Sequence, residues 1–300
     1  MKKIIKEINK LRKDRNAIIL AHNYQLPEVQ DVADYRGDSL ELSRIAASTS
    51  ASVVVFCGVH FMAETASILC PDKKVLIPDA RAGCPMANMI TPEDLIELKA
   101  RHPKAVTVGY VNTSAAVKAE LDICCTSTNA VDLILKLKHK DEIIFIPDKY
   151  LADYVSKKTG RRLISWDGYC PTHVKILPED IIRQIRAHPQ AKVLVHPECT
   201  PEVILLADEV LSTGKMYKYV KDSSAKEFII GTEVGIIYRL KCDNPSKSFY
   251  PASELAVCPN MKKINLEKVL WSLEDLKEEV KVPEDIRKKA IRPIEKMLSM

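Results

Sequence analysis

Three cysteines that are each followed directly by proline are the residues whose type and spacing most clearly indicate chemistry in this sequence. Cys84, Cys170 and Cys258 lie 86 and 88 residues apart in a chain of 300 residues. If the chain repeats with this period, the three side chains meet where the repeats meet. Soft thiolate ligands select zinc, copper(I) or iron–sulfur clusters. Three buried cysteines that pack as small apolar side chains are the alternative, and the repeated Cys-Pro pair favours metal ligands.

A [4Fe–4S] cluster on three cysteines would keep one iron free of protein ligands. Such an iron is a Lewis acid that can polarise a hydroxyl or carboxylate group for loss of water. The sequence holds no Cys-X-X-Cys pair, which argues against a zinc knuckle or a ferredoxin-type ligand run. Its nine cysteines are an odd number, which argues against a secreted disulfide framework. The sequence leaves open whether two of the outlying cysteines form a disulfide, because intracellular disulfides occur in hyperthermophiles.

Polar side chains recur at nearly the same period, first after 88 residues and then after 86. One set follows hydrophobic runs, and the other consists of hydroxyls at expected helix starts. Hydroxyls and amides at a helix N-terminus can hold an anion such as phosphate, although an ordinary N-cap role is the alternative for each hydroxyl. The two sets are His22, Tyr110 and His196, and Ser39, Ser127 and Thr213.

Further polar residues accompany these two sets. Glu198 follows His196 by two residues, and side chains two residues apart on an extended segment point the same way. We therefore expect both to face one ligand. Tyr24 and Asn112 add hydroxyl and amide groups. His173 lies three residues after the second cysteine of the repeat, and we expect it either to face the pocket or to cap a helix.

Other residues of the same types fit the pattern less well. Lys262 and Lys263 follow the third cysteine, and a solvated lysine pair is favoured over an anion site. The remaining cysteines near the expected pocket, Cys124, Cys125 and Cys199, break the threefold pattern and are left out of the ligand set. Surface or loop positions are expected for His60, His102, His139 and His188.

Short strands alternating with helices must position these residues. The runs 53–56, 143–146 and 228–230 are apolar without polar alternation, so both of their faces should be buried. Each repeat reads as helix, strand, polar loop, helix, strand, helix, strand and Cys-Pro. This alternation predicts parallel sheets with right-handed crossovers. Ligands of such sheets lie beyond the carboxyl ends of the strands.

The predicted fold class is therefore α/β, with three similar three-layer α/β/α domains and short parallel sheets. Internal triplication relates them by pseudo-threefold symmetry, with the active site at the centre. The helix start Pro92-Glu93-Asp94 supports the triplication, because it returns as Pro178-Glu179-Asp180. The predicted domains are residues 1–83, 84–169 and 170–264, and the segment 265–300 is expected to pack back on the first.

Composition excludes several functional classes. The net charge of +5 is modest and spread out, and no basic run with interleaved aromatics suggests nucleic acid. No apolar run reaches about 18 residues, so no membrane span is expected. The first residues alternate charge with apolar positions at helical spacing, unlike a signal peptide, and we expect a cytoplasmic protein. Glycine is scarce, with 9 residues, and no G-x-G-x-x-G or P-loop motif occurs.

Taken together, the motifs resemble those of a known family, quinolinate synthase, the A protein of de novo NAD biosynthesis. The resemblance covers the whole chain. It rests on Ala21-His22-Asn23-Tyr24-Gln25, Gly37-Asp38-Ser39, Cys84-Pro85-Met86-Ala87-Asn88, Tyr110-Val111-Asn112, Cys125-Thr126-Ser127, His196-Pro197-Glu198-Cys199, Ser212-Thr213-Gly214, Gly231-Thr232-Glu233 and Ala256-Val257-Cys258-Pro259-Asn260-Met261.

The resemblance implies a three-domain α/β/α fold and the condensation of iminoaspartate with dihydroxyacetone phosphate to quinolinate, phosphate and water. It also implies a [4Fe–4S] cluster with one open iron on Cys84, Cys170 and Cys258. An L-aspartate oxidase or dehydrogenase would supply the imine by transient hand-over. The implied catalytic residues are His22, Tyr24, Tyr110, His196 and Glu198. The implied substrate-binding residues are His22, Ser39, Tyr110, Val111, Asn112, Ser127, His196, Pro197, Glu198 and Thr213.

Two other functions stay open at this point. One is an iron–sulfur hydro-lyase that acts on another dicarboxylate. The other is a non-enzymatic metal-binding protein, for instance one with a structural zinc on the axis. The sequence gives neither the oligomeric state nor the order of the chemical steps. It also does not tell which hydroxyl would hold the phosphate.

Overall fold

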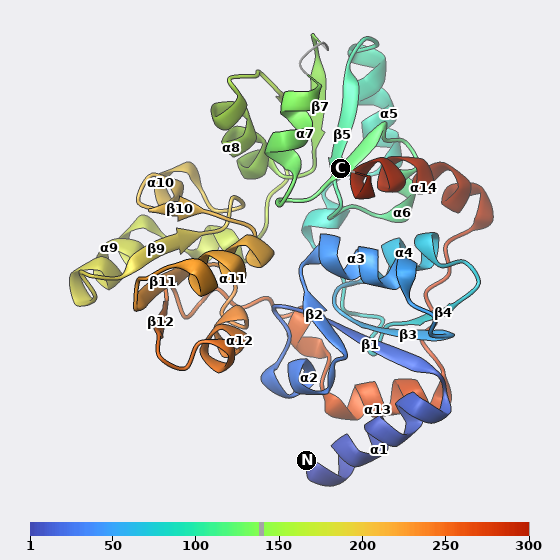
Figure 1. Cartoon of the computed structure of the whole chain (residues 1–300). Coiled ribbons are helices and arrows are strands. Elements are labelled where there is room, and N and C mark those ends of the chain that lie inside the picture. The colour runs from blue at the N-terminus through green and yellow to red at the C-terminus, as the bar shows by residue number, and fades with distance from the viewer. Residues whose placement is uncertain (138–140, 300) are drawn as a thin grey trace.

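The computed structural model describes residues 1–137 and 141–299, and it consists of three α/β units that each hold a four-stranded parallel sheet (Figure 1). The strand orders are β2-β1-β3-β4, β6-β5-β7-β8 and β10-β9-β11-β12. The three orders are identical once each unit is numbered from its own first strand. This identity confirms three similar α/β/α units. His139, which was expected at the surface or in a loop, lies outside the described residues.

The first unit is built around the predicted strands 17–22 and 53–56. Its central strand pair is fully parallel, with Leu20 opposite Phe56, and both side chains are buried. Helices cover both faces of the sheet. The elements are α1 (Lys2–Asp14), β1 (Ala17–His22), α2 (Pro27–Val32), β2 (Tyr35–Gly37), α3 (Ser39–Ser48), β3 (Val53–Cys57), α4 (His60–Leu69) and β4 (Lys74–Leu76).

The second and third units repeat this arrangement, and each opens on a short 3₁₀ helix. The second comprises η1 (Met86–Asn88), α5 (Pro92–Arg101), β5 (Val106–Tyr110), α6 (Ala115–Lys118), β6 (Ile123–Cys125), α7 (Ala130–Lys136), β7 (Ile143–Ile146), α8 (Lys149–Thr159) and β8 (Ile164–Ser165). The third comprises η2 (His173–Lys175), α9 (Pro178–Ala187), β9 (Lys192–Val195), α10 (Pro201–Ile204), β10 (Glu209–Val210), α11 (Thr213–Asp222), β11 (Glu227–Gly231), α12 (Ile236–Asp243) and β12 (Ser248–Pro251).

The predicted repeat missed one strand in each unit. The short strands β2, β6 and β10 lie at a sheet edge in the stretch that was predicted to be a polar loop. They contain only two or three residues, which is too few to show a hydrophobic period. In β2, Tyr35 is exposed, so this strand also lacks the buried apolar run that identified the others.

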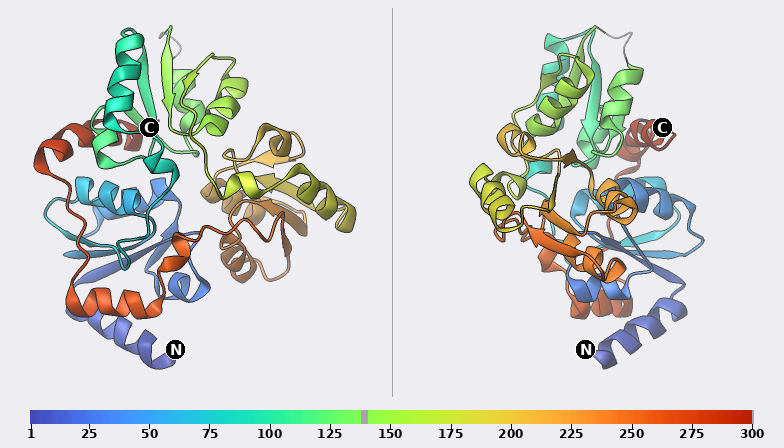
Figure 2. Two further views of the ribbon diagram at one scale, coloured as in Figure 1. Left: turned by 180° about the vertical axis from the view of Figure 1, so that it is seen from behind. Right: turned by 60° about the vertical axis from the view of Figure 1, so that its left-hand side comes forward.

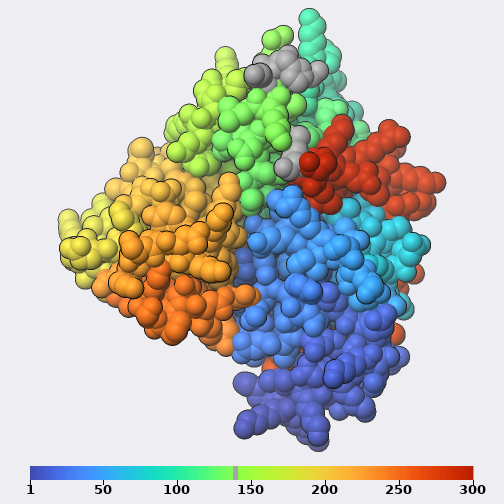
Figure 3. Space-filling model, viewed as in Figure 1, coloured from blue at the N-terminus to red at the C-terminus, as the bar shows by residue number. Residues whose placement is uncertain are grey.

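The C-terminal segment, which begins with η3 (Met261–Lys263), returns to the first two units. Helix α13 (Leu266–Asp275) packs on α1, and α14 (Glu284–Leu298) packs on β6, α6 and α4. Figure 2 shows α13 beside α1 at one end of the molecule and α14 beside the second unit. In the space-filling view, α14 lies along the seam between the first and second units (Figure 3). The domain boundaries given above stay a prediction.

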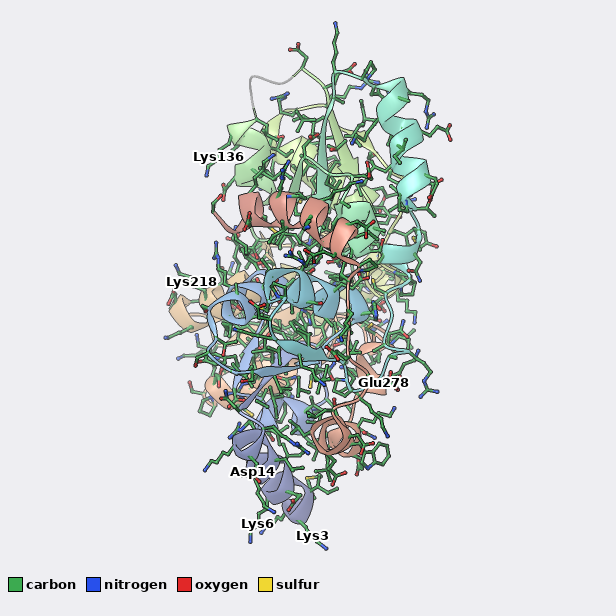
Figure 4. The ribbon with its side chains drawn as sticks, turned by 90° about the vertical axis from the view of Figure 1, so that its right-hand side faces the viewer. Lys3, Lys6, Asp14, Lys136, Lys218 and Glu278 are labelled. Atoms are coloured by element: carbon green, nitrogen blue, oxygen red, sulfur yellow. The ribbon has the colours of Figure 1, made fainter. Side chains whose placement is uncertain are left out.

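Helix α1 forms the tip of the molecule, and its polar face points outward. The labelled side chains of Lys3, Lys6 and Asp14 extend away from the body (Figure 4), while Ile8 on the opposite face is fully buried. Across residues 1–137 and 141–299, no helix combines the length and the apolar character that crossing a bilayer requires. The cytoplasmic location stays a prediction.

Candidate active site

A cavity of about 170 Å³ lies where the three units meet. His22 and Tyr110 are the last residues of β1 and β5, and His196 directly follows β9. The carboxyl ends of parallel strands thus aim equivalent side chains at one centre. The sequence-predicted residues that line the cavity are His22, Tyr24, Ser39, Cys84, Tyr110, Asn112, Ser127, Cys170, His196, Glu198, Thr213 and Cys258.

Val111 and Pro197 do not line this cavity. Both are buried beside residues that do line it. The backbone N–H of Val111 donates to Cys125 O at 2.9 Å. Their roles as binding residues therefore stay a prediction.

The hydroxyl residues lie close to helix starts, but none of them is the N-cap. Ser39 is the first residue of α3, whose N-cap is Asp38, and Thr213 is the first residue of α11. Ser127 lies two residues before Asn129, the N-cap of α7. The expected helix N-terminal position is therefore wrong for Ser127. Since other residues cap the helices, these hydroxyls stay available to a ligand.

Asn23 and His196 also bond to the cavity hydroxyls. Asn23 Nδ2 donates to Thr213 Oγ1 at 3.0 Å, which joins the first unit to the third. His196 Nε2 lies 3.2 Å from Ser127 Oγ, which joins the third unit to the second. Each serine or threonine oxygen that accepts here keeps its own O–H for an anion.

His22 and His196 share one local geometry. The backbone N–H two residues later donates to Nδ1 of each ring, at 3.2 Å from Tyr24 and at 3.3 Å from Glu198. Burial lowers the pKa of both histidines to about 3, although Glu198 opposes this shift. The rings are therefore neutral near pH 7, with the proton on Nε2. Each histidine thus presents a neutral N–H donor rather than a cation.

The segment that carries Glu198 is a turn, and the extended segment expected from the sequence is wrong. The backbone N–H of Cys199 donates to His196 O at 3.0 Å, which closes the turn. Pro197 lies inside this turn. His196 and Glu198 still reach the same cavity, because the turn folds the carboxylate back toward the ring.

A chain of short polar contacts crosses the cavity and joins all three units. Tyr110 Oη donates to Glu198 Oε1 at 2.5 Å, and Glu198 Oε2 lies 2.8 Å from His173 Nδ1. On the other side of the ring, His173 Nε2 lies 2.8 Å from Thr232 Oγ1. That hydroxyl is 2.5 Å from the hydroxyl of Tyr24. A proton can therefore be passed between groups that face one cavity.

Electrostatics assign these groups definite protonation states. Burial alone would raise the pKa of Glu198, but His173 and His196 hold it below its usual value. Burial, reinforced by Glu198, raises the pKa of Tyr24 and Tyr110. The site therefore holds one carboxylate between neutral phenols, which suits a base with nearby acids. His173 was expected as either a pocket residue or a helix cap, and the structure places it in the pocket.

The three repeated cysteines have the same surroundings. Each sulfur accepts the backbone N–H groups of the residues two and three positions later, because a 3₁₀ helix begins within three residues of each Cys-Pro pair. Burial raises the pKa of Cys84 to about 12, against these amides. The donors are Met86 and Ala87 for Cys84, Thr172 and His173 for Cys170, and Asn260 and Met261 for Cys258.

This arrangement fits a thiolate-bound metal centre. Three sulfurs face one cavity, and each has two amide dipoles that stabilise negative charge on it. Buried thiols with raised pKa values stay protonated on their own, and a metal that binds them displaces those protons. The donor set is therefore compatible with the cluster that the sequence suggested.

Comparison with known proteins decides the family. A family model described as Quinolinate synthetase A protein matches residues 6–299. This chain belongs to the quinolinate synthetase A protein family. It is 58% identical to the quinolinate synthase of Dehalococcoides mccartyi strain CBDB1 over 292 residues, covering 97% of this chain and 96% of the relative. The resemblance found in the sequence is thus confirmed, and the chain is an enzyme of the quinolinate synthase class.

Two further relatives, from other organisms, are slightly less identical to this chain. The quinolinate synthase of Thermodesulfovibrio yellowstonii is 55% identical over 297 residues, which cover 99% of this chain and 98% of the relative. That of Methanosarcina barkeri is 52% identical over 297 residues, which cover 99% of this chain and 97% of the relative. The similarity extends over the full length, so all three units are shared with these proteins.

A second set of possible ligands in this quinolinate synthetase family chain needs separate treatment. Among the described residues, Cys170, His173 and Glu198 bring a sulfur, a ring nitrogen and a carboxylate oxygen within 4.8 Å of one another. However, Glu198 and Thr232 already occupy the two ring nitrogens of His173. A single ion there would break this chain of polar contacts and leave two of the repeated cysteines unused.

Other groups of the same region serve the structure. Cys124, Cys125 and Cys199 are fully buried and do not line the cavity. Lys262 is not the solvated residue that the sequence suggested. Its Nζ lies 2.9 Å from an oxygen of Glu233, and its side chain is only 19% exposed. The sequence could not show this pair, because its two residues belong to different loops.

Proposed function

We propose that this chain is a quinolinate synthase that condenses iminoaspartate with dihydroxyacetone phosphate, with release of phosphate and water. The observation that carries the proposal is the chain of short polar contacts from Tyr110 through Glu198 and His173 to Tyr24. It faces three cysteines and three hydroxyl side chains in one cavity. The reaction needs proton transfers, a leaving phosphate and loss of water, and this cavity offers groups for each.

Glu198 is proposed as the general base. It is ionised and buried, and it contacts one phenol and one imidazole. It can take a proton from a carbon that becomes a nucleophile, and a phenol or imidazole of the chain can return one to oxygen. Tyr110 and Tyr24 stay protonated because their pKa values are raised. They are therefore proposed as the acids.

The anionic groups of the substrates are proposed to bind the hydroxyls and the two neutral histidines. Ser39, Ser127 and Thr213 come from three different units, and the substrates bring one phosphate and two carboxylates. The Nε2–H groups of His22 and His196 add donors to the same region. Neutral donors bind an anion without a permanent countercharge, so the phosphate is not held after it leaves.

The proposed cofactor is a [4Fe–4S] cluster on Cys84, Cys170 and Cys258. When bound, it would supply a Lewis acid for loss of water. The proposed supplier of the imine is an enzyme that oxidises or dehydrogenates L-aspartate. Imines hydrolyse in water, so a short transfer between the two enzymes would preserve the substrate.

The test is a complete anaerobic assay. Purified protein reconstituted with iron and sulfide is mixed with dihydroxyacetone phosphate and with iminoaspartate formed from oxaloacetate and ammonium. Quinolinate and phosphate should appear in equal amounts. A protein that hydrates or dehydrates a dicarboxylate without phosphate release would instead be a hydro-lyase. A colourless zinc protein without turnover would contradict both enzymatic proposals.

A further inference from the structure

The buried ion pair between Glu233 and Lys262 lies where the third unit touches the first. Glu233 is fully buried, and Lys262 Nζ lies 2.9 Å from its Oε1 and 3.2 Å from its Oε2. Oε2 also accepts the backbone N–H of Gly235 at 2.7 Å. A buried charge pair of this kind is costly to desolvate, and removal of one partner alone leaves an uncompensated buried charge.

This ion pair contacts two parts of the proposed active site. Glu233 Oε1 accepts the backbone N–H of Cys258 at 3.1 Å, so the carboxylate holds the loop of a proposed cluster ligand. Lys262 Nζ donates to the carbonyl oxygen of Tyr24 in the first unit. One pair therefore connects a cysteine loop of the third unit to the tyrosine loop of the first.

Tyr24 is held at three points as a result. Its N–H donates to His22, its carbonyl accepts from Lys262, and its hydroxyl bonds to Thr232. Thr232 directly precedes Glu233 in the chain. The phenol and the main chain of Tyr24 are thus both positioned by one short segment of the third unit.

Gly235 leaves the space that this arrangement needs. A methyl group in place of its hydrogen would come within 2.6 Å of Lys262 Nζ and 2.8 Å of Tyr24 O. Any larger residue would therefore push apart the lysine and the carbonyl oxygen that it contacts. The glycine gives a way to disturb the contact without changing any charge.

The second unit shows a related contact at the matching position. Asp148 lies two residues after β7, as Glu233 lies two residues after β11. It is fully buried. Burial raises its pKa, and the backbone N–H of Cys170 is among the groups that oppose this shift. In the part of the chain that the structure describes, an acidic side chain thus lies beside two of the three cysteine loops, and in the third unit a lysine extends the contact to another unit.

We infer that Glu233 and Lys262 form a clasp that positions Tyr24 against the Cys258 loop, and that both are positioning residues of the enzyme. Glu233 fixes the cysteine loop. Lys262, which is paired with Glu233, holds the loop of His22 and Tyr24 in place relative to the cysteine loop. The inference rests on the proposed function for its effect on turnover, but the geometry of the clasp does not depend on the substrate.

The experiment compares Lys262→Met, the double variant Lys262→Met with Glu233→Gln, and Gly235→Ala. Lys263→Met is the matched control, because Nζ of the neighbouring Lys263 donates to Arg81 O and, among the described residues, to neither Glu233 nor Tyr24. Lys262→Met leaves a buried charge unpaired, so its melting temperature should fall. The double variant carries no unpaired charge and should recover iron content and part of the lost stability, because a glutamine oxygen can still accept from Cys258 while its NH2 group cannot accept from Gly235.

Turnover should separate the clasp from an ordinary structural ion pair. Loss of a residue that supports the groups around a metal centre typically lowers activity about 10–100-fold. We expect kcat to fall by this amount in Lys262→Met and to stay low in the stable double variant, since Tyr24 O has still lost its donor. KM should change less than kcat. A double variant with the kcat of the Lys263→Met control would overturn the inference.

A second measurement is independent of turnover. Hydrogen exchange of the substrate-free protein should be faster in the peptide that spans residues 22–30 when Lys262 or Gly235 is replaced, and unchanged in Lys263→Met. Equal exchange in all variants would overturn the clasp. If the unaltered protein forms no quinolinate, the proposed function fails, and exchange still decides whether the clasp exists.

Discussion

At the scale of single residues, the chemistry of the cavity follows from burial and from the groups that face each other. His22 and His196 are buried and accept a backbone N–H at Nδ1, so they act as neutral donors. Glu198 is equally buried, but Nδ1 of His173 lies 2.8 Å from its Oε2 and keeps it ionised. Burial thus favours the neutral form of all three groups, and the neighbouring histidines decide that Glu198 stays charged.

The first prediction concerns the role of Glu198. Glu198→Gln keeps the shape of the side chain but removes its basicity, so kcat should fall about 10²–10⁴-fold. The KM of either substrate should change much less, because the hydroxyls still hold the anions. Steady-state kinetics on protein with full iron content measure both. Glu202→Gln, an exposed carboxylate four residues later, serves as control, and a Glu198→Gln enzyme as fast as that control would contradict the role.

The second prediction concerns the stability of the metal-free protein at mildly acidic pH. The pKa of His22 and His196 is about 3 in the folded state, against 6.5 as the ordinary value. Below pH 6.5 the unfolded chain binds more protons than the folded chain, so stability falls as the pH falls toward 3. Each histidine contributes up to about 1.4 kcal/mol per pH unit in this window.

Urea unfolding at pH 7.5 and pH 5.5 tests this expectation. His22→Gln and His196→Gln should each lose less stability between the two pH values than the unaltered protein. His188→Gln is the control, because His188 stacks on Tyr250 outside the cavity. Equal losses in all four proteins would show that neither buried histidine limits stability in acid.

At the scale of elements, each cysteine depends on the short 3₁₀ helix that follows it. Proline fixes the backbone at the residue after the cysteine, and the turn that follows aims two N–H groups back at the sulfur. The same Cys-Pro start therefore produces the same sulfur environment three times. The surrounding cysteines lack this element, which gives a direct test.

The third prediction is that Cys84→Ala, Cys170→Ala or Cys258→Ala each abolishes stable cluster binding. Cys57→Ala, Cys70→Ala and Cys242→Ala should retain it, because these cysteines do not line the cavity. Iron and sulfide analysis with anaerobic absorbance measures the content. A Cys170→Ala protein with a full complement of iron and sulfide would refute the assignment.

The fourth prediction separates ligand binding from helix capping. Thr213→Val and Ser127→Ala remove hydroxyls that do not cap a helix, so stability should change little in Ser127→Ala, whereas Thr213→Val also leaves the buried Asn23 amide without its acceptor and should cost about 1–3 kcal/mol. Each should raise a KM about 10–100-fold, since a hydrogen bond to a charged group is worth about 1.5–3 kcal/mol. Ser212→Ala removes the N-cap of α11 and should instead cost about 1 kcal/mol of stability. Unchanged KM values would leave Thr213 and Ser127 without a binding role.

The sequence predicted these elements where a period was visible. The triplication placed His22, Tyr110 and His196 at equivalent positions, and the structure brings them into one cavity. No periodic pattern in the sequence indicated the contacts between loops of different units. Thr232 and Glu233 contact Tyr24 and Lys262 only after the units assemble. From the sequence, Lys262 was therefore expected to be one of two solvated lysines.

Local errors had equally physical causes. A helix start is specified by a short run of polar residues, so Ser39 was placed within one position of the real cap, Asp38. Ser127 lies before a helix that begins later, at Ala130, and the repeat alone could not show that shift. The turn after His196 was missed because Pro197 reads equally well as part of an extended segment.

At the scale of the whole molecule, the three units are held together by apolar packing and not by the proposed cofactor. A continuous buried core joins the first two units and reaches into the third, where a second core lies. Cys84, Cys170 and Cys258 only pack at the edge of the larger core. Helix α14 closes the seam between the first two units. The fold should therefore persist without the metal centre.

The last prediction follows from this separation of core and cofactor. Exposure to air should abolish quinolinate formation, because an iron without a protein ligand is open to oxidants at the cavity. The far-ultraviolet circular dichroism and the melting transition should persist, because the three cysteines only pack at the edge of the larger core. Activity, iron content and circular dichroism should be followed in parallel after exposure to air. Reconstitution with iron and sulfide under anaerobic conditions should then restore activity to the same folded protein. If secondary structure is lost together with iron, the centre is structural, as in domains that fold only around their metal, and the apolar packing between units is too weak to hold the fold alone.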